Sequence, residues 1–168
     1  LYTSALCSDF DLEGRRAGEF LLKKYQNTSR PINIVEIVGT VDSTPAIGRY
    51  QGFRDVISAY PKFHVIFSES GDFMLSKGRE IMQQVLKRYD PEDIDVLYSH
   101  NDDMTFGAIE VMKEAGIAPG KDIAIISVDA TQRIIDYLKE GVVNCVIECN
   151  PNSGPQVMDI AKKIVAGE

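Results

Sequence analysis

Polar and aromatic side chains are concentrated in short segments of the 168-residue sequence that directly follow apolar runs. An arginine guanidinium, a carboxylate or an asparagine amide is planar and two-pronged, so each can bind neighbouring hydroxyl groups of a polyol, while an aromatic ring stacks on its apolar face. The side chains placed to do this are Arg49, Asp72, Phe73, Asn101, Asp129 and Glu148. Their shared chemistry is the recognition of hydroxyl groups, which needs no catalytic group.

Each of these residues also has a purely structural interpretation. The alternatives are a solvated helix charge for Arg49, a turn residue for Asp72, a core residue for Phe73, a helix cap for Asn101 or Asp129, and a strand-end surface acid for Glu148. A common location at one edge of a sheet would favour binding over these alternatives. The elements that carry the residues therefore decide the question.

Five apolar runs alternate with segments of helical periodicity. The runs predict strands at residues 32–38, 64–68, 95–99, 123–128 and 144–147. The 3–4 spacing of apolar residues predicts helices at residues 9–26, 43–60, 76–89, 102–115, 131–139 and 153–166. Continuous apolar strands separated by helices imply a doubly wound, mostly parallel sheet with helices on both faces, a three-layer α/β fold. Ligands of such sheets bind outside the carboxyl ends of the strands, where the polar segments lie.

Composition and missing motifs exclude several classes of protein. With 18 Lys and Arg against 25 Asp and Glu, the formal charge of −7 disfavours nucleic acid and anionic membranes as partners. No apolar stretch approaches the roughly 18 residues of a membrane span. The sequence has no G-x-G-x-x-G, no G-x-x-x-x-G-K-[ST] and no G-x-S-x-G. We therefore expect neither a cofactor nor an enzymatic reaction.

Metal binding and disulfide bonding are also not expected. His100 lies close to Asp102 and Asp103, but one histidine beside two acids is a weak metal signature, and acids are common at helix N-termini. Cys145 and Cys149 are four residues apart in a strand, which separates their Cα atoms by about 13 Å and prevents a bridge. We expect all three cysteines to be free and buried.

The polar segments together resemble a known family. They read Gly39-Thr40 through Ala46-x-x-Arg49-x-x-Gly52-Phe53, Ser70-Gly71-Asp72-Phe73-x-x-x-Lys77-Gly78, His100-Asn101-Asp102-Asp103-Met104-x-x-Gly107-Ala108-Ile109, Glu114-Ala115-Gly116-x-x-Pro119-Gly120-Lys121-Asp122, Ser127-Val128-Asp129 and Glu148-x-x-Pro151. In this order and spacing they resemble the type I periplasmic sugar-binding proteins, which include the ribose- and galactose-binding proteins. The galactofuranose-binding members are the most similar, and the resemblance covers nearly the whole chain.

The resemblance implies the carboxy-terminal lobe of a two-lobed protein, with residues 1–8 as the crossover from a missing lobe and residues 9–168 as the lobe itself. It assigns Arg49, Asn101 and Asp129 to sugar hydrogen bonds and Phe73 to stacking, with weaker matches for Asp72 and Glu148. A monosaccharide would be bound unchanged and delivered to the membrane permease of an ATP-driven (ABC) importer. The full-length protein would be a monomeric periplasmic protein or an extracellular, membrane-anchored lipoprotein.

One alternative shares the fold and the Asn-Asp-x-Met motif: the effector lobe of a lac-repressor-type transcription regulator. Those regulators usually read Gly-Phe-Asp-Asp where this chain has Ser127 to Ala130. The sequence upstream would decide, since a signal or lipoprotein peptide indicates the binder and a helix-turn-helix the regulator. If Asp129 and Arg49 bind sugar, truncating either is expected to weaken affinity and to leave stability nearly unchanged.

Overall fold

A computed structural model describes residues 3–167 of the chain, and its centre is a five-stranded, all-parallel sheet of order β2-β1-β3-β4-β5. The strands are β1 (Ile32–Val38), β2 (Phe63–Ser70), β3 (Val96–Ser99), β4 (Ala124–Asp129) and β5 (Cys145–Glu148). Pairing is in parallel register throughout, with one irregularity between Ile34 and Val35 where β1 meets the edge strand β2. All five carboxyl ends therefore lie at one edge of the sheet.

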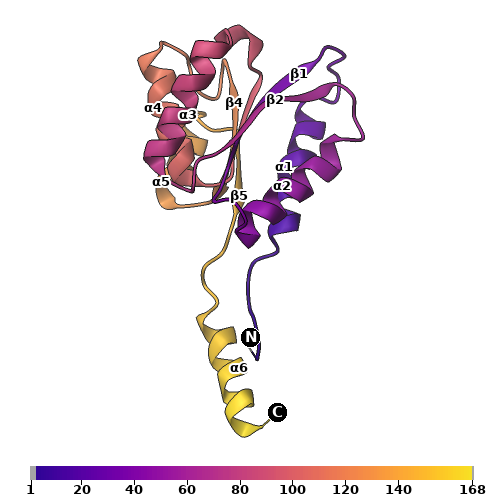
Figure 1. Ribbon diagram of the computed structural model, residues 1–168, viewed down its shortest axis with the longest axis vertical. Coiled ribbons are helices and arrows are strands. Elements are labelled where there is room, and N and C mark those ends of the chain that lie inside the picture. The colour runs from indigo at the N-terminus through magenta and orange to yellow at the C-terminus, as the bar shows by residue number, and fades with distance from the viewer. Residues whose placement is uncertain (1–2, 168) are drawn as a thin grey trace.

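Helices cover both faces of this sheet (Figure 1). They are α1 (Phe10–Lys24), α2 (Thr44–Ile57), α3 (Leu75–Arg88), α4 (Asp102–Glu114), α5 (Gln132–Lys139) and α6 (Gly154–Ala166), with a short 3₁₀ helix at Pro91–Asp93. Helices α1 and α2 pack on one face, and α3, α4 and α5 pack on the other. The prediction of a doubly wound, three-layer α/β fold is confirmed.

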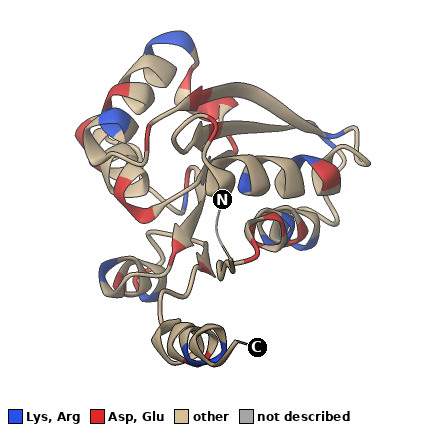
Figure 2. Cartoon of the chain, turned by 60° about the horizontal axis from the view of Figure 1, so that its bottom comes forward, with Lys and Arg blue, Asp and Glu red and all other residues tan. Residues whose placement is uncertain are grey.

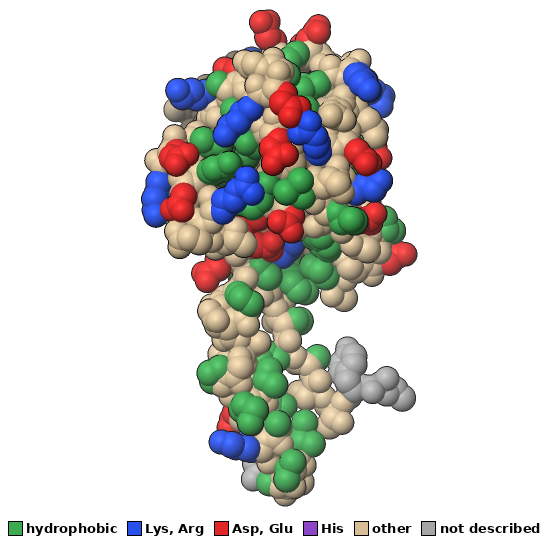
Figure 3. Space-filling view, turned by 90° about the vertical axis from the view of Figure 1, so that its left-hand side faces the viewer, with side chains coloured by type: hydrophobic (Ala, Val, Ile, Leu, Met, Phe, Trp, Pro, Cys, Tyr) green, Lys and Arg blue, Asp and Glu red, His purple; other side chains and the backbone are tan. Residues whose placement is uncertain are grey.

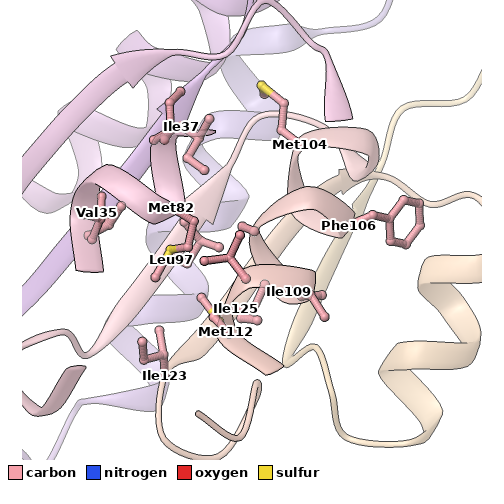
Figure 4. Packing of buried hydrophobic residues seen from close by; sticks show 14 of the residues in the cluster. Val35, Ile37, Met82, Leu97, Met104, Phe106, Ile109, Met112, Ile123 and Ile125 are labelled. Atoms are coloured by element: carbon pink, nitrogen blue, oxygen red, sulfur yellow. The ribbon is translucent and has the colours of Figure 1, made fainter. Parts of the chain in front are cut away.

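The larger hydrophobic core lies between the sheet and the α3–α4 pair. Strand residues such as Val35, Leu97 and Ile125 meet Met82 and Ile109 from the helices, and all five are fully buried or nearly so (Figure 4). These are the apolar positions that the alternating strand and helix periods place on facing surfaces. The core fixes β1, β3 and β4 side by side and so sets the positions of the segments that follow them.

Glycines bring the helices of each pair into backbone contact. A Cβ atom added to Gly52 of α2 would lie 2.0 Å from the backbone oxygen of Asp11 in α1. A Cβ atom on Gly107 of α4 would lie 2.1 Å from the oxygen of Leu75 in α3. Side chains larger than hydrogen cannot occupy these positions unless the helices separate. The two pairs therefore hold α2 and α4, which carry Arg49 and Asn101 at their N-terminal ends, in fixed places.

Two local expectations are corrected. The helix predicted over residues 43–60 ends at Ile57, because Tyr60 is exposed and its N–H closes a turn onto the carbonyl of Ile57. The cysteines are free, as predicted, but they are not all buried: Cys7 is exposed, because it lies in the extended segment before α1, while the other two are half-buried.

Charged residues of both signs are interspersed on the same helices (Figure 2). In the described part of the chain, no helix is long and apolar enough to cross a membrane.

Helix α6 lies apart from the sheet, beside the N-terminal segment (Figure 1). None of its residues is buried, and Val157, Met158 and Val165 are exposed. Hydrophobic side chains gather along this part of the molecule (Figure 3). Within the described chain, α6 has no core to pack against.

Candidate functional site

Four of the six predicted residues meet in one cavity at the carboxyl edge of the sheet. The cavity has a volume of about 260 Å³ and is lined by Phe10, Pro45, Arg49, Phe73, Asn101, Asp129 and Cys149. Its walls come from α1, the first two turns of α2, the last residue of β4 and the segments that follow β2, β3 and β5. The sheet edge that the sequence indicated is therefore where these side chains converge.

Arg49 is the central cation of the cavity. Its Nε donates to Oε2 of Glu13 at 2.8 Å, one Nη donates to the carbonyl of His100, and the other Nη lies 3.6 Å from Oδ1 of Asp129. Arg49 and Glu13 are both almost completely buried. The solvated-charge alternative for Arg49 is wrong, because this guanidinium is fixed from three sides.

His100 supports Arg49 from beneath the cavity. Its side chain is fully buried, with Nε2 3.4 Å from Oε1 of the buried Glu36. Burial lowers the pKa of His100, so the imidazole is neutral near pH 7. No cluster of three or more His, Cys, Asp or Glu side chains that could hold a metal ion occurs in residues 3–167.

Phe73 forms one wall of the cavity, with its ring centre 5.9 Å from Cζ of Arg49. The ring lies over Gly39 at the end of β1, where an added Cβ atom would come within 2.0 Å of it. Asp72 and Phe73 both have positive φ angles, 51° and 60°, which non-glycine residues rarely adopt. Such strain at a loop that places an aromatic ring is a feature of ligand sites.

Asn101 performs the capping role and also lines the cavity. Its Oδ1 accepts the backbone N–H of Met104 at 3.0 Å, which caps α4, and its Nδ2 donates to the carbonyl of Phe73 at 3.2 Å. The cap therefore ties the segment after β3 to the segment after β2. One N–H and one lone pair of the amide remain for a ligand.

Asp129 ends β4 in a strained conformation, with φ values of 122° at Asp129 and 71° at Ala130. Its carboxylate accepts the N–H of Asp102 at 3.4 Å and does not cap α5, whose first residues make no side-chain cap bond. Burial raises the pKa of Asp129 to about 6, against the opposing effect of Arg49. Asp129 is thus a partly desolvated acceptor beside a fixed cation.

Asp102 stabilises the turn after Asp129. Its two carboxylate oxygens accept from the hydroxyl of Ser127 at 2.6 Å and from the N–H and hydroxyl of Thr131, both at 2.8 Å. Asp102 is buried and lies outside the set of residues that line the cavity. It positions the segment after β4 through these bonds.

The structure does not bring Asp72 and Glu148 into the cavity. The Asp72 carboxylate is exposed and accepts the hydroxyl of Ser70 at 3.2 Å, which is the turn alternative. Glu148 is exposed at the end of β5 and is not among the residues that line the cavity. Cys149, one residue further on, reaches the cavity instead.

Phe10, Glu13 and Cys149 are residues of the site that sequence reasoning missed. Phe10 begins α1 directly after the capping Asp9, and Glu13 follows one turn later on the same helix. The thiol of Cys149 lies 3.5 Å from the hydroxyl of Ser8. Phe10 gave a weak signal as an aromatic residue at a helix start, whereas a helix acid such as Glu13 looks like any solvated charge in sequence.

The raised pKa of Asp129 predicts how stability depends on pH. The folded protein binds the Asp129 proton more tightly than the unfolded chain does. The bound proton therefore adds its full contribution to the free energy of unfolding below pH 4, and this contribution is lost as the pH rises through about 6. Because the side chain is 34% exposed, solvent screening limits the decrease in the free energy of unfolding to about 1–2 kcal/mol. Urea unfolding at pH 4 and pH 7 should show this decrease in the wild-type protein and not in Asp129→Asn. Equal pH dependence in both proteins would contradict the prediction.

Comparison with known proteins gives the chain's relationships. Residues 2–168 match the family described as periplasmic binding protein domain. The galactofuranose-binding protein YtfQ of Escherichia coli K12 is 39% identical, covering 97% of this chain and 51% of that protein. The ribose import binding protein RbsB of Salmonella typhimurium is 29% identical, covering 98% and 53%. The chain thus spans about half the length of these curated relatives.

Solved structures agree. A Mycobacterium smegmatis protein in complex with β-D-fucofuranose is 45% identical, with a TM-score of 0.90, over 96% of this chain and 52% of that one. The periplasmic binding component of the arabinose ABC transporter from Shewanella sp. ANA-3, bound to arabinofuranose, is 38% identical, also with a TM-score of 0.90 and the same coverage. The match of almost the whole chain to the family, together with these relatives, shows that the chain belongs to the periplasmic binding proteins.

Proposed function

We propose that this chain provides half of a binding site for a neutral monosaccharide in its furanose form. The observation that carries the proposal is the cavity in which the Arg49–Asp129 pair and the Asn101 amide face the same space as the ring of Phe73. Sugar hydroxyls would donate to the Asp129 carboxylate and accept from the remaining N–H groups of Arg49 and Asn101. The Phe73 ring would cover an apolar face of the sugar.

The furanose form is supported by the ligands of similar proteins. The M. smegmatis and Shewanella structures are described with fucofuranose and arabinofuranose, and YtfQ is described as galactofuranose-binding. A five-membered ring with an exocyclic arm is compact enough for a cavity of about 260 Å³ closed by a second wall. The second wall would come from a partner lobe, since this cavity is open on one side.

The domain organisation is part of the same proposal. Residues 1–8, of which 1 and 2 lie outside the described residues, would connect to a first lobe, and residues 9–168 would form the second. Helix α6 supports the existence of a first lobe, because its apolar side chains lack a core within the described chain. The coverage of about half of each relative supports it independently.

Delivery of the sugar, chemically unchanged, to the membrane permease of an ATP-driven importer completes the proposal. It places the full-length protein outside the cytoplasm, as a monomer in the periplasm or held at the cell surface by a lipid anchor. The name of the Shewanella relative, a component of an arabinose ABC transporter, supports this role.

The test compares the full-length protein with the isolated 168-residue chain. Calorimetric titration with arabinose, galactose, fucose and ribose should give micromolar affinity for the full-length protein. For the isolated chain we expect millimolar dissociation constants, which correspond to a binding free energy of about 4 kcal/mol. The affinity is low because the second lobe, which would cover the other side of the sugar, is missing. Mass spectrometry of recovered ligand should show unaltered sugar. An oxidised, phosphorylated or cleaved product, or micromolar binding by the isolated monomeric chain, would overturn the proposal.

A further inference from the structure

A second hollow lies on the outer side of α2, away from the sugar cavity. This outer groove has a volume of about 690 Å³ and runs between α2 and the carboxyl half of β2, with Val41, Asp42, Ile47, Tyr50, Arg54 and Glu69 among its lining residues. The strand that forms one side of this groove, β2, is the edge strand of the sheet. The groove is larger than the cavity of about 260 Å³ that holds Arg49 and Phe73.

The wall of the outer groove is unusually apolar for a free surface. Val41 is 65% exposed, Ile47 49% and Tyr50 42%, and all three line the same hollow. The Tyr50 ring packs against Arg54, with Cζ of Arg54 4.8 Å from the ring centre. Contiguous exposed apolar side chains of this kind mark interaction surfaces, and Tyr and Arg are the residue types that anchor them.

The rim of the outer groove is acidic. Arg54 is already paired with the buried Glu36 at 2.6 Å, and Asp55 is paired with Arg15 at 2.7 Å. Asp42 and Glu69 form no ion pair with any residue in the range 3–167, and both are exposed. A partner for this surface therefore carries apolar side chains flanked by Lys or Arg.

The outer groove and the sugar cavity share one helix. Pro45 and Arg49 of α2 line the cavity, while Ile47 and Tyr50, from the same two turns, line the groove. The buried residues Glu36 and His100 connect the two sides. Glu36 accepts from Arg54 of the groove at 2.6 Å and lies 3.4 Å from Nε2 of His100, and the His100 carbonyl accepts from Arg49 of the cavity. A partner bound in the groove would therefore lie next to the carboxyl edge of the sheet, where the sugar cavity opens.

We infer that the outer groove is the surface by which this lobe docks on a basic and apolar segment of the importer's membrane subunit. This inference rests on the proposed function, because a sugar carrier must hand its ligand over at the carboxyl edge of the sheet. The exposed wall of Val41, Ile47 and Tyr50 supplies the apolar contact, and Asp42 and Glu69 select the positive charge.

The test uses the full-length protein and membrane vesicles from the organism that makes it. A photo-crosslinking amino acid at position 50 should link to a membrane subunit of an ATP-driven importer, identified by mass spectrometry. The same group at position 138 should not, since Leu138 is similarly exposed, at 37%, but lies on α5. The double variant Val41→Ser/Tyr50→Ser should weaken vesicle binding at least tenfold, and Leu138→Ser should leave it within twofold.

Charge is tested separately with Asp42→Asn/Glu69→Gln. Asparagine suits the positive φ of 63° at position 42, so the backbone there is kept. This variant should weaken binding several-fold at low salt and remove most of its salt dependence. Unchanged vesicle binding in both double variants would overturn the inference, as would a crosslink from position 50 only to lipid or to a second copy of the chain.

Sugar affinity, measured by calorimetry on the same variants, separates the two proposals. It should stay within twofold of the wild type, because no groove residue named here lines the cavity. A parallel loss of sugar affinity would show that the groove is part of the sugar site and would overturn the docking inference. If the protein carrying the photo-crosslinking amino acid at position 50 links to the importer but the wild-type protein binds none of the sugars, the proposed monosaccharide function fails and the docking surface stands.

Discussion

Replacing Arg49 by alanine is expected to lower the free energy of unfolding by about 3–5 kcal/mol and to abolish measurable sugar binding. The affinity loss follows from the place of Arg49 in the cavity. The stability loss follows from Glu13, whose carboxylate would stay buried without its partner at 2.8 Å. The sequence led us to expect that truncating Arg49 would leave stability nearly unchanged, and the buried pair revises that expectation. Urea unfolding and calorimetric titration measure the two effects.

The matched control is Arg79→Ala, because the Arg79–Glu114 pair, at 2.7 Å, is at the surface and should cost less than about 1 kcal/mol. The double variant Arg49→Ala/Glu13→Ala should recover part of the lost stability, since it also removes the buried carboxylate that has lost its partner, but none of the sugar binding. If Arg49→Ala unfolds like the wild type, the Arg49–Glu13 pair is not a buried support of the site.

Substituting Gly52 by alanine is expected to destabilise the protein by about 3 kcal/mol. The added Cβ atom would lie 2.0 Å from the backbone oxygen of Asp11, so α1 and α2 must move apart. Because α2 carries Arg49, the same displacement should weaken sugar binding in the full-length protein. Unfolding by urea, with far-ultraviolet circular dichroism as the probe, measures the change.

Gly154→Ala is the control for this substitution, since nothing lies within 4 Å of an added Cβ atom there. It should change stability by no more than about 0.5 kcal/mol. A Gly52→Ala protein as stable as the wild type would mean that the α1–α2 contact can relax at little cost.

Most of the fold could be predicted because each strand is a continuous apolar run. The strand predicted at residues 32–38 is confirmed without change, and the helix predicted at residues 102–115 ends one residue earlier, at Glu114. The helix predicted to reach residue 60 stops at Ile57, because an exposed Tyr60 cannot be distinguished from a core residue by spacing alone. Periodicity reports which residues are apolar, and tertiary contacts decide which of them are covered.

The site was predictable only where a strand end supplies the residue. Asn101 follows β3 and Asp129 ends β4, so parallel topology alone brings them to one edge. Glu148 also ends a strand and is paired with Asp129, yet it is exposed and does not line the cavity, so a position at a strand end does not by itself place a residue in the site. Glu13 could not be found, since it approaches Arg49 only through the close crossing of α1 and α2 that the glycines permit. Such a contact is a property of helix packing and leaves no local pattern.

The isolation of α6 has a consequence for the exchange of backbone amide hydrogens with solvent. A helix of 13 residues, none of them buried, is marginal in water, so its amides open independently of the rest of the chain. In the isolated chain these amides would exchange near the rate of an unfolded peptide, while those of β1, β3 and β4 would exchange only on global unfolding. The molecule is thus two units of very different local stability, and the exchange pattern divides the chain near Pro151 and not at its terminus.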